Sequence, residues 1–312
     1  MTVYDLKTMQ RCEISENTVV ALGTFDGCHS GHLAVFMAAL DEAKKRRIKS
    51  AVYTFDEIPR AKIEGKSVPC VFTLDEKIRF IRKTGIDYIV IDKIENVRNM
   101  SGEEFFEKIL RNSLHAVCAS CGFNYRFGKN ASWNSNDLAN FFEKAGGSVR
   151  ISDEITVSGR PLSSTLIREM TENGEVEKIL GFAPPYSIYA KVLHGKTLGR
   201  TIGVPTINQK IPDGKAIPMR GVYITECEIG EDVYPSVTNV GMRPTTDGEN
   251  ASENVETHII GYEGNLYSSF VRVNFYKFLR NEKKFGSVED LKKQILLDEK
   301  CAKEYFGIAD KQ

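Results

Sequence analysis

The sequence predicts two domains of different class: a doubly wound parallel α/β sheet comes first, and a smaller antiparallel β domain with a terminal helix follows. In residues 18–180, short apolar runs alternate with helix-length amphipathic segments, a pattern typical of crossover units in a parallel sheet. After residues 181–185, Gly-Phe-Ala-Pro-Pro, the apolar runs are separated by Gly, Pro, Asn and Asp turns without intervening helices. That spacing is typical of an antiparallel barrel or sandwich, and of the two we expect the barrel. The 312 residues are enough for each domain to bury its own core.

The first domain is expected to contain five strands connected by helices. Capping boxes at Thr73-x-x-Glu76 and Ser101-x-x-Glu104 predict the start of two of these helices. We place the strands at residues 18–22, 51–55, 88–91, 116–119 and 149–151. The helix after residue 31 should turn inward the apolar side chains Leu33, Phe36, Met37 and Leu40.

The second domain is expected to begin at residue 183, so that the domains span residues 1–182 and 183–312. We place its strands at residues 186–193, 221–227, 233–239, 256–262 and 270–275. Ser287-x-x-Asp290 predicts the start of the terminal helix. The inward side of that helix should carry Leu291, Ile295, Ala302 and Tyr305.

Charge and composition argue against nucleic acid or membrane as a partner. Lys plus Arg equals Asp plus Glu, 42 against 42, and no stretch approaches the ~20 apolar residues that cross a bilayer. The basic run at residues 44–47 is either a nucleic-acid patch or a helix end, and its place at the end of an amphipathic segment favours the helix end. Seven scattered cysteines and the lack of a signal-like N-terminus predict a cytoplasmic protein. Cys118 and Cys121 have C-x-x-C spacing, but they end an apolar run and have no second pair, which favours core residues over a redox or metal site.

The segment Gly23–His32, GTFDGCHSGH, is the most informative part of the first domain. It follows the first predicted strand and opens a helix, where free backbone N–H groups and the helix dipole favour phosphate. Gly27 and Gly31 let the backbone approach such a ligand closely. His29 and His32 can both donate to phosphate oxygens; the alternative, a zinc pair, would need a third protein ligand that no His or Cys supplies at the usual spacing.

This G-x-F-D-G-x-H-x-G-H pattern resembles the nucleotidyltransferase superfamily and, more narrowly, the FAD-synthetase half of prokaryotic bifunctional riboflavin kinases. Residues 163–168, SSTLIR, are similar to the second signature of that family, and residues 122–128, GFNYRFG, to a further motif. The resemblance implies a Rossmann-like domain that adenylylates FMN with ATP, with His29, His32 and Arg168 in catalytic roles. The residues implied to bind ATP or its phosphates are Gly23, Phe25, Asp26, Gly27, Gly31, Asn124, Ser164 and Thr165.

Adenylyl transfer to FMN needs no general base, because the attacking phosphate is already ionised. Positioning and charge stabilisation then carry the reaction, with Mg²⁺ on the phosphates of ATP. The chain departs from the family pattern at Glu57 and Ile58, within F-x-P-H-P, and at Trp133 and Asn134, where a glycine and an acid are usual. We expect both stretches to border the nucleotide and to change its affinity more than the chemical step.

The second domain carries a different set of motifs. Gly195-Lys196-Thr197 is not the end of a P-loop, because Ala190 stands where a glycine is required. Instead, residues 194–200 (HGKTLGR), 203–208 (GVPTIN) and 256–258 (ETH) resemble, in this order, the riboflavin-kinase domain, whose pattern is P-T-x-N followed by E-T/V-H. Matching stretches also lie at residues 221–223, 239–245, 266–267 and 279–285.

The resemblance implies that this domain phosphorylates riboflavin with ATP. Thr206 and Asn208 would hold Mg²⁺ through a hydroxyl and an amide oxygen, and glycines such as Gly195 and Gly203 would form a flap over the nucleotide. Glu256 would act as the general base, which is useful because the acceptor is a neutral ribityl hydroxyl.

The expected function is therefore a bifunctional enzyme with riboflavin, FMN, FAD and ATP/ADP as its small-molecule partners. Three alternatives stay open: a riboflavin kinase whose first half adenylylates weakly or not at all, a non-catalytic flavin-nucleotide sensor, and a cytidylyltransferase. The oligomeric state is not specified by the sequence.

Overall fold

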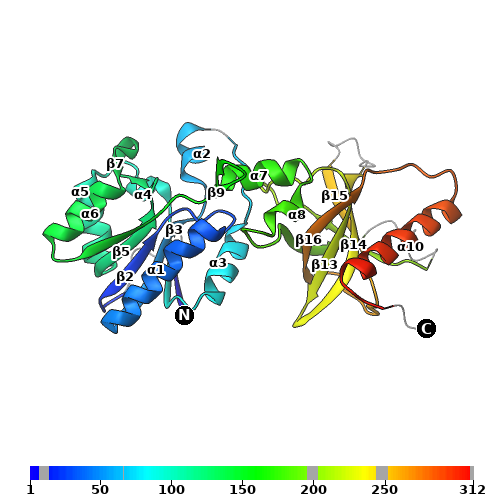
Figure 1. Ribbon diagram of the computed structural model, residues 1–312, viewed down its shortest axis with the longest axis horizontal. Coiled ribbons are helices and arrows are strands. Elements are labelled where there is room, and N and C mark those ends of the chain that lie inside the picture. Colours follow the sequence, from blue (N-terminus) through cyan, green and yellow to red (C-terminus); the bar gives the residue numbers. More distant parts are fainter. Residues whose placement is uncertain (7–13, 66, 195–202, 244–251, 310–312) are drawn as a thin grey trace. The chain divides into compact units, whose positions relative to one another are not determined.

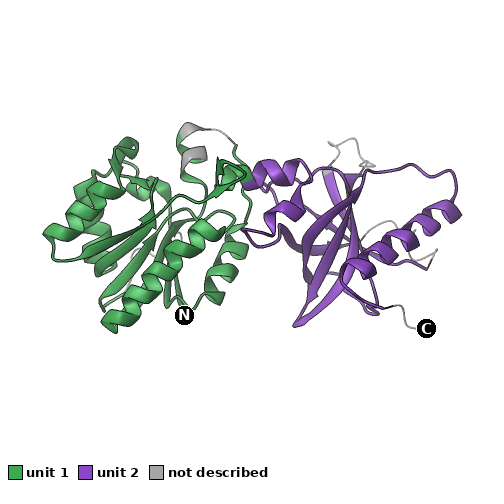
Figure 2. Cartoon of the chain, in the orientation of Figure 1, with its two compact units in different colours: residues 1–166 green, residues 167–312 purple. Residues whose placement is uncertain are grey.

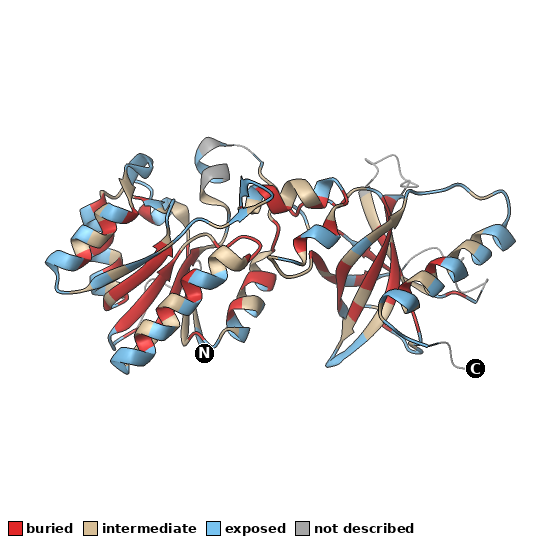
Figure 3. Ribbon diagram, in the orientation of Figure 1, coloured by how far each residue is buried: buried red, intermediate tan, exposed pale blue. Residues whose placement is uncertain are grey.

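The chain folds into two compact units. The computed structural model describes residues 1–6, 14–65, 67–194, 203–243 and 252–309, and the units span Met1–Leu166 and Ile167–Gln312 (Figure 2). The predicted domain boundary at residues 182/183 stays a prediction. In each unit the buried residues concentrate in the strands (Figure 3).

Unit 1 is built on a six-stranded parallel sheet with the order β1-β4-β3-β2-β5-β8 (Figure 1). The strands are β1 (Thr2–Asp5), β2 (Thr18–Leu22), β3 (Lys49–Phe55), β4 (Tyr88–Asp92), β5 (Ala116–Gly122) and β8 (Ser148–Ser152). All five residues of β2 are buried, as expected for a central strand covered by helices on both faces. From β2 the chain winds toward β3 in one direction, whereas β5 and β8 extend the sheet in the other. The strand order therefore reverses between β2 and β5, the place where doubly wound sheets bind ligands.

Helices and short ribbons connect the strands of unit 1. The helices are α1 (Ser30–Arg46), α2 (Pro59–Glu64), α3 (Leu74–Lys83), α4 (Ile94–Val97), α5 (Gly102–Glu104), the π-helix η1 (Phe105–Ser113), the 3₁₀ turn η2 (Lys129–Ala131) and α6 (Ser135–Lys144). The ribbons are β6 (Arg126–Phe127) with β7 (Trp133–Asn134), and β9 (Thr156–Val157) with β10 (Arg160–Pro161). Both predicted capping boxes are present, at Thr73 and Ser101.

Two features of unit 1 differ from the prediction. The edge strand β1 was not anticipated; only four residues long, it pairs with β4. The inward face of α1 was predicted only in part, because Phe36 is buried as expected while Leu33 and Met37 are exposed. The buried side of the helix carries Val35 and the small residues Ala39 and Ala43 instead.

The basic run lies at the end of a helix, and the C-x-x-C pair lies in a buried strand, as the sequence favoured. Residues 44–46 form the last turn of α1, and Arg46 pairs with Glu42. Cys118 and Cys121 are buried in β5.

Unit 2 is a closed antiparallel barrel, so the prediction of a barrel in place of a sandwich is confirmed. Its strand order is β11-β12-β15-β14-β13-β16, and β16 pairs back with β11. The elements of this unit are α7 (Ser164–Glu172, which begins in unit 1), α8 (Val176–Ile179), β11 (Ser187–Leu193), β12 (Thr206–Lys210), β13 (Gly221–Ile229), β14 (Asp232–Arg243), β15 (Ser252–Ile259), β16 (Phe270–Arg280) and α10 (Val288–Tyr305). The strand β12 was not predicted.

Side chains fill the interior of the barrel. Thr225, Thr238 and Thr257 are fully buried and joined by hydroxyl contacts of 2.8 and 2.9 Å, and the Gln209 amide donates to two backbone carbonyls. Because neighbouring residues of a strand point to opposite sides, Asn208 and Glu256, beside Gln209 and Thr257, lie on the outer face. A ligand of this unit therefore has to bind outside the barrel.

The terminal helix α10 begins at the predicted cap, where Ser287 accepts from the backbone of Asp290. Ala302 is buried as expected, whereas Tyr305 is exposed. None of the helices in the described part of the chain combines the length and the apolar character that crossing a bilayer requires.

Candidate active sites

A cavity of about 710 Å³ in unit 1 opens where the sheet order reverses. The segment after β2 supplies Gly23, His29 and His32 to its lining, and the segment after β5 supplies Asn124. The carboxyl ends of these two parallel strands meet at the same edge of the sheet. Seven residues predicted to bind or activate ATP thus lie around one space: Gly23, Phe25, His29, Gly31, His32, Asn124 and Ser164.

The turn after β2 is tightly wound around Phe25. Phe25 and Gly27 adopt positive φ angles of 54° and 76°, and the Phe25 ring packs 4.5 Å from that of Phe36. A Cβ atom on Gly23 would lie 2.8 Å from the Phe25 ring. Gly23 is therefore required by this local packing as well as by its position on the cavity.

His29 and His32 stack on each other at the start of α1, with ring centroids 3.7 Å apart. Burial lowers the pKa of His29 to about 4, and it lowers the pKa of His32 well below its usual value, with smaller contributions from His29 and Lys77. Both imidazoles are therefore neutral at pH 7. The Nδ1 atoms of both rings are buried and have no hydrogen-bond partner among the described residues. Buried polar atoms of this kind call for a ligand, and a helix N-terminus favours an anion.

A buried lysine behind the cavity was missed by the sequence reasoning. The Lys77 ammonium donates to the carbonyl oxygens of Thr24 and Phe55 at 2.9 and 2.8 Å, and burial lowers its pKa. These bonds join the segment after β2 to the last residue of β3. The capping box at Thr73 contained a usable signal, because it fixes the start of α3 and places Lys77 one turn before the buried Ile81.

Asp26, which was predicted to bind ATP or its phosphates, is held in the turn by hydrogen bonds and does not line the cavity. Asp26 Oδ1 accepts from the backbone of Val71 and Phe72 at 2.8 and 2.9 Å, and the Ser164 hydroxyl donates to the Asp26 carbonyl at 2.7 Å. Over the described residues the lining includes Ser164 but not Asp26, Gly27 or Thr165. The contacts of Asp26 indicate that it holds the turn in place.

Arg168 follows Ser164 by one turn of α7, in the part of that helix that belongs to unit 2.

The departures from the family pattern divide into two groups. Ile58 lines the cavity, whereas Glu57 is exposed and pairs with Lys62 at 3.1 Å. Trp133 packs against Gly102 and Gly128, where a Cβ would lie 2.5 Å from the indole. Asn134 caps α6. Neither Trp133 nor Asn134 is among the described residues that line this cavity, and whether they border the nucleotide stays a prediction.

In unit 2, the predicted kinase residues meet on the outer face of two neighbouring strands. Asn208 lies opposite Glu256 in the pairing of β12 with β15, and the Thr206 hydroxyl donates to Glu256 Oε1 at 2.7 Å. Asn208 Oδ1 accepts from Asn254 at 3.0 Å. A hydroxyl, an amide oxygen and a carboxylate thus lie together.

This donor set fits Mg²⁺ that is bound mainly through nucleotide phosphates. Mg²⁺ prefers hard oxygen ligands and keeps several waters. Across the described ranges no three His, Cys, Asp or Glu side chains form a metal-binding group. A cation at Thr206 and Asn208 would therefore need further ligands from the substrate.

The predicted flap is described only at its ends. Gly195 lies outside the described residues, and Gly203 has a positive φ of 76°. The ring of His194 stacks on Tyr267 with centroids 3.9 Å apart. A small cavity of about 50 Å³ beside Thr206 is lined in part by Tyr267.

Comparison with known proteins finds one family model in each half of the chain. The FAD synthetase family model matches residues 11–166 and the riboflavin kinase model residues 182–306. A bifunctional riboflavin kinase/FMN adenylyltransferase from Haemophilus influenzae is 32% identical to this chain, and the match covers 94% of this chain and 96% of that protein. One from Bacillus subtilis is 30% identical, and the match covers 95% of this chain and 94% of that protein. A crystal structure described as a macrolide-efflux protein from Streptococcus pneumoniae superposes with a TM-score of 0.84 and 30% identity, covering 97% of this chain and 99% of that one. The chain belongs to the family of bifunctional riboflavin kinases/FMN adenylyltransferases.

Proposed function

We propose that this enzyme phosphorylates riboflavin with ATP to give FMN in unit 2, and adenylylates FMN with a second ATP to give FAD and pyrophosphate in unit 1. The proposal rests on one observation: in each unit, side chains that can bind phosphate groups or their cation lie close together. His29 and His32 lie on the cavity of unit 1, and Thr206, Asn208 and Glu256 lie side by side on the barrel of unit 2.

For the adenylyl transfer, the chain's task is to bind and orient charged groups. The free N–H groups at the start of α1 and the neutral rings of His29 and His32 donate to phosphate oxygens of ATP, and Arg168 adds a positive charge. The attacking phosphate of FMN needs no base. Lys77 holds the loops behind this site and contributes to the local positive potential.

For the kinase reaction, Glu256 takes the proton of the attacking ribityl hydroxyl. The Thr206 hydroxyl donates a hydrogen bond to Glu256, so its oxygen lone pairs remain available to a cation. Thr206 and Asn208 would hold Mg²⁺, which supplies charge neutralisation on the transferred phosphate. Glycines around residue 203 would close over the nucleotide.

One alternative, a kinase with an inactive first unit, rested on the departures from the family pattern. Trp133 and Asn134 are not among the described residues that line the cavity, which weakens this alternative, and Ile58 remains as a change at the lining. We also propose a cytoplasmic location, which the free thiols of the six cysteines in the described residues support.

Two separate half-reactions test the proposal. Riboflavin with ATP and Mg²⁺ should give FMN and ADP, and FMN with ATP and Mg²⁺ should give FAD and pyrophosphate. FMN without FAD, at saturating ATP and with reduced flavin also tried, would leave the kinase-only alternative. Binding without any turnover would indicate the flavin-nucleotide sensor, and activity with CTP in place of ATP would indicate the cytidylyltransferase.

A further inference from the structure

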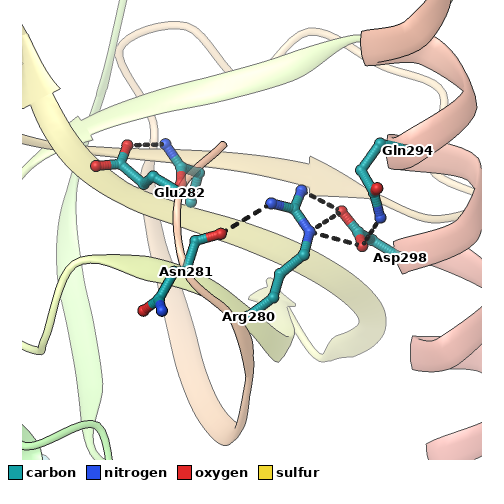
Figure 4. A network of polar contacts seen from close by, with 6 residues as sticks. Arg280, Asn281, Glu282, Gln294 and Asp298 are labelled. Atoms are coloured by element: carbon teal, nitrogen blue, oxygen red, sulfur yellow. Dashed lines mark hydrogen bonds and ion pairs between the residues drawn. The ribbon is translucent and has the colours of Figure 1, made fainter. Parts of the chain in front are cut away.

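The terminal helix α10 is fastened to the barrel by an ion pair whose carboxylate is buried. Arg280, at the end of β16, donates to both oxygens of Asp298 at 2.6–3.2 Å, and Asp298 is only 3% exposed (Figure 4). Gln294 donates to the same carboxylate at 3.0 Å. A guanidinium–carboxylate pair with two parallel bonds fixes orientation as well as distance. The turn of α10 around Asp298 is therefore held in one position on the barrel.

This fixed turn also presents Glu299 to a histidine of the kinase face. His258 follows Glu256 by two residues in β15, so both side chains lie on the outer face. His258 Nε2 lies 3.5 Å from Glu299 Oε2. Lys303, one turn further along α10, pairs with the other oxygen of Glu299 at 2.9 Å.

The second nitrogen of His258 reaches the start of β12. Its Nδ1 atom lies 2.9 Å from the carbonyl oxygen of Pro205, and because a carbonyl only accepts, Nδ1 carries the proton. Pro205 has no N–H and cannot donate to the sheet ladder. The contact with His258 therefore anchors the residue that comes directly before Thr206.

From these contacts we propose that His258, whose ring lies beside Glu299, is a positioning residue of the riboflavin kinase site and acts on Thr206 through the Pro205 carbonyl. His258 lies opposite Thr206 in the strand pairing, and Thr206 in turn bonds Glu256. Both ring nitrogens of His258 face protein groups, so the ring is not placed to take a proton from the substrate. The inference rests on the proposed kinase function.

Two substitutions distinguish the role of the Nδ1 atom of His258 from that of its Nε2 atom. In His258→Asn the amide nitrogen can occupy the place of Nδ1 and keep the bond to Pro205, whereas in His258→Gln it lies near the place of Nε2. Loss of a residue that orients metal ligands typically costs about 10–100-fold in metal affinity or activity. His258→Gln should therefore lower kcat for FMN formation and raise the Mg²⁺ concentration for half-maximal rate by about 10-fold or more, with the KM for riboflavin little changed. His258→Asn should stay close to the wild type.

The test also includes a measurement that does not depend on turnover. Calorimetric titration with Mg²⁺ and ADP should show weaker binding to His258→Gln than to His258→Asn, while the midpoint of thermal unfolding stays the same in both. Lys300→Gln is the matched control on α10, because Lys300 is exposed and pairs with Glu304 at 3.9 Å. Its kinetics should equal those of the wild type.

Failure of this inference differs from failure of the proposed function. A wild-type protein that does not phosphorylate riboflavin contradicts the function itself. A wild-type kinase in which the Asn and Gln variants behave alike, whether both active or both impaired, overturns the role of the Pro205 contact. If His258→Gln does not fold, His258→Ala replaces it, because alanine also lacks a donor to the Pro205 carbonyl, and an unchanged Mg²⁺ requirement in that variant overturns the proposal.

Discussion

Acidification should destabilise unit 1 through His29. Burial lowers the pKa of this imidazole from 6.5 to about 4 in the folded protein, whereas the unfolded chain keeps the ordinary value of about 6.5. Below pH 6.5 the unfolded state therefore binds a proton that the folded state excludes. The contribution to stability is complete above about pH 6.5 and is lost as the pH falls toward about 4.

The size of the effect follows from these two values. Each unit of pH between them costs about 1.4 kcal/mol, and pH 5 lies about 1.5 units below the unfolded pKa, so the loss between pH 7 and pH 5 is about 2 kcal/mol. His32 acts in the same direction, because burial also lowers its pKa. In His29→Gln, which has no titrating group at this place, about 2 kcal/mol of the acid-induced loss should disappear.

The single tryptophan of the chain allows this acid-induced loss of stability to be measured for unit 1 separately. Trp133 packs against Gly102 and Gly128 inside that unit, so its fluorescence during urea unfolding reports on unit 1. The free energy of unfolding is compared at pH 7 and pH 5 for the wild type and His29→Gln. His115→Asn is the control, because His115 is exposed, and asparagine tolerates its positive φ of 47°. If His29→Gln and the wild type lose the same free energy on acidification, His29 is not the buried neutral group described above.

Three further predictions concern single positions. Glu256→Gln should lower kcat for FMN formation by ~10²–10⁴ while FAD formation from supplied FMN survives; an unchanged kcat in steady-state assays removes Glu256 from the mechanism. Thr206→Ala and Asn208→Ala should raise the Mg²⁺ requirement and weaken ATP binding in the kinase reaction only, and magnesium titrations that match the wild type contradict their assignment as ligands. Trp133→Phe should lower the stability of unit 1, measured by thermal unfolding, but leave the KM for ATP in FAD formation unchanged; a raised KM would place the indole at the nucleotide after all.

The sequence was sufficient where local patterns determine structure. The alternation of strands and helices predicted the parallel sheet, and the Gly-rich segment after β2 predicted that His29 and His32 belong to one site. In the second half, the ordered motifs predicted that Thr206, Asn208 and Glu256 belong to one site, and the structure places them on neighbouring strands.

The remaining features depend on contacts between distant segments. The strand β12, Thr-Ile-Asn-Gln-Lys, is largely polar, and it is a strand because it pairs with β11 and β15. The inward face of α1 depends on how closely the helix approaches the sheet. The anchoring of Pro205 by His258 and Glu299 joins residues about fifty and ninety positions apart, a separation that no local pattern encodes.

The central claim is that one chain performs the two reactions at two separate sites, and mixing two variants tests it most directly. Each variant is incubated with riboflavin, ATP and Mg²⁺, alone and together, and FMN and FAD are followed by chromatography. His29→Ala should accumulate FMN without FAD, because removing one preorganised donor typically costs ~10²–10³ in rate. Glu256→Gln should form almost no FMN, and the mixture should form FAD, since FMN released by the first variant is adenylylated by the second. Loss of both products in each variant, with no FAD from the mixture, would contradict two independent sites.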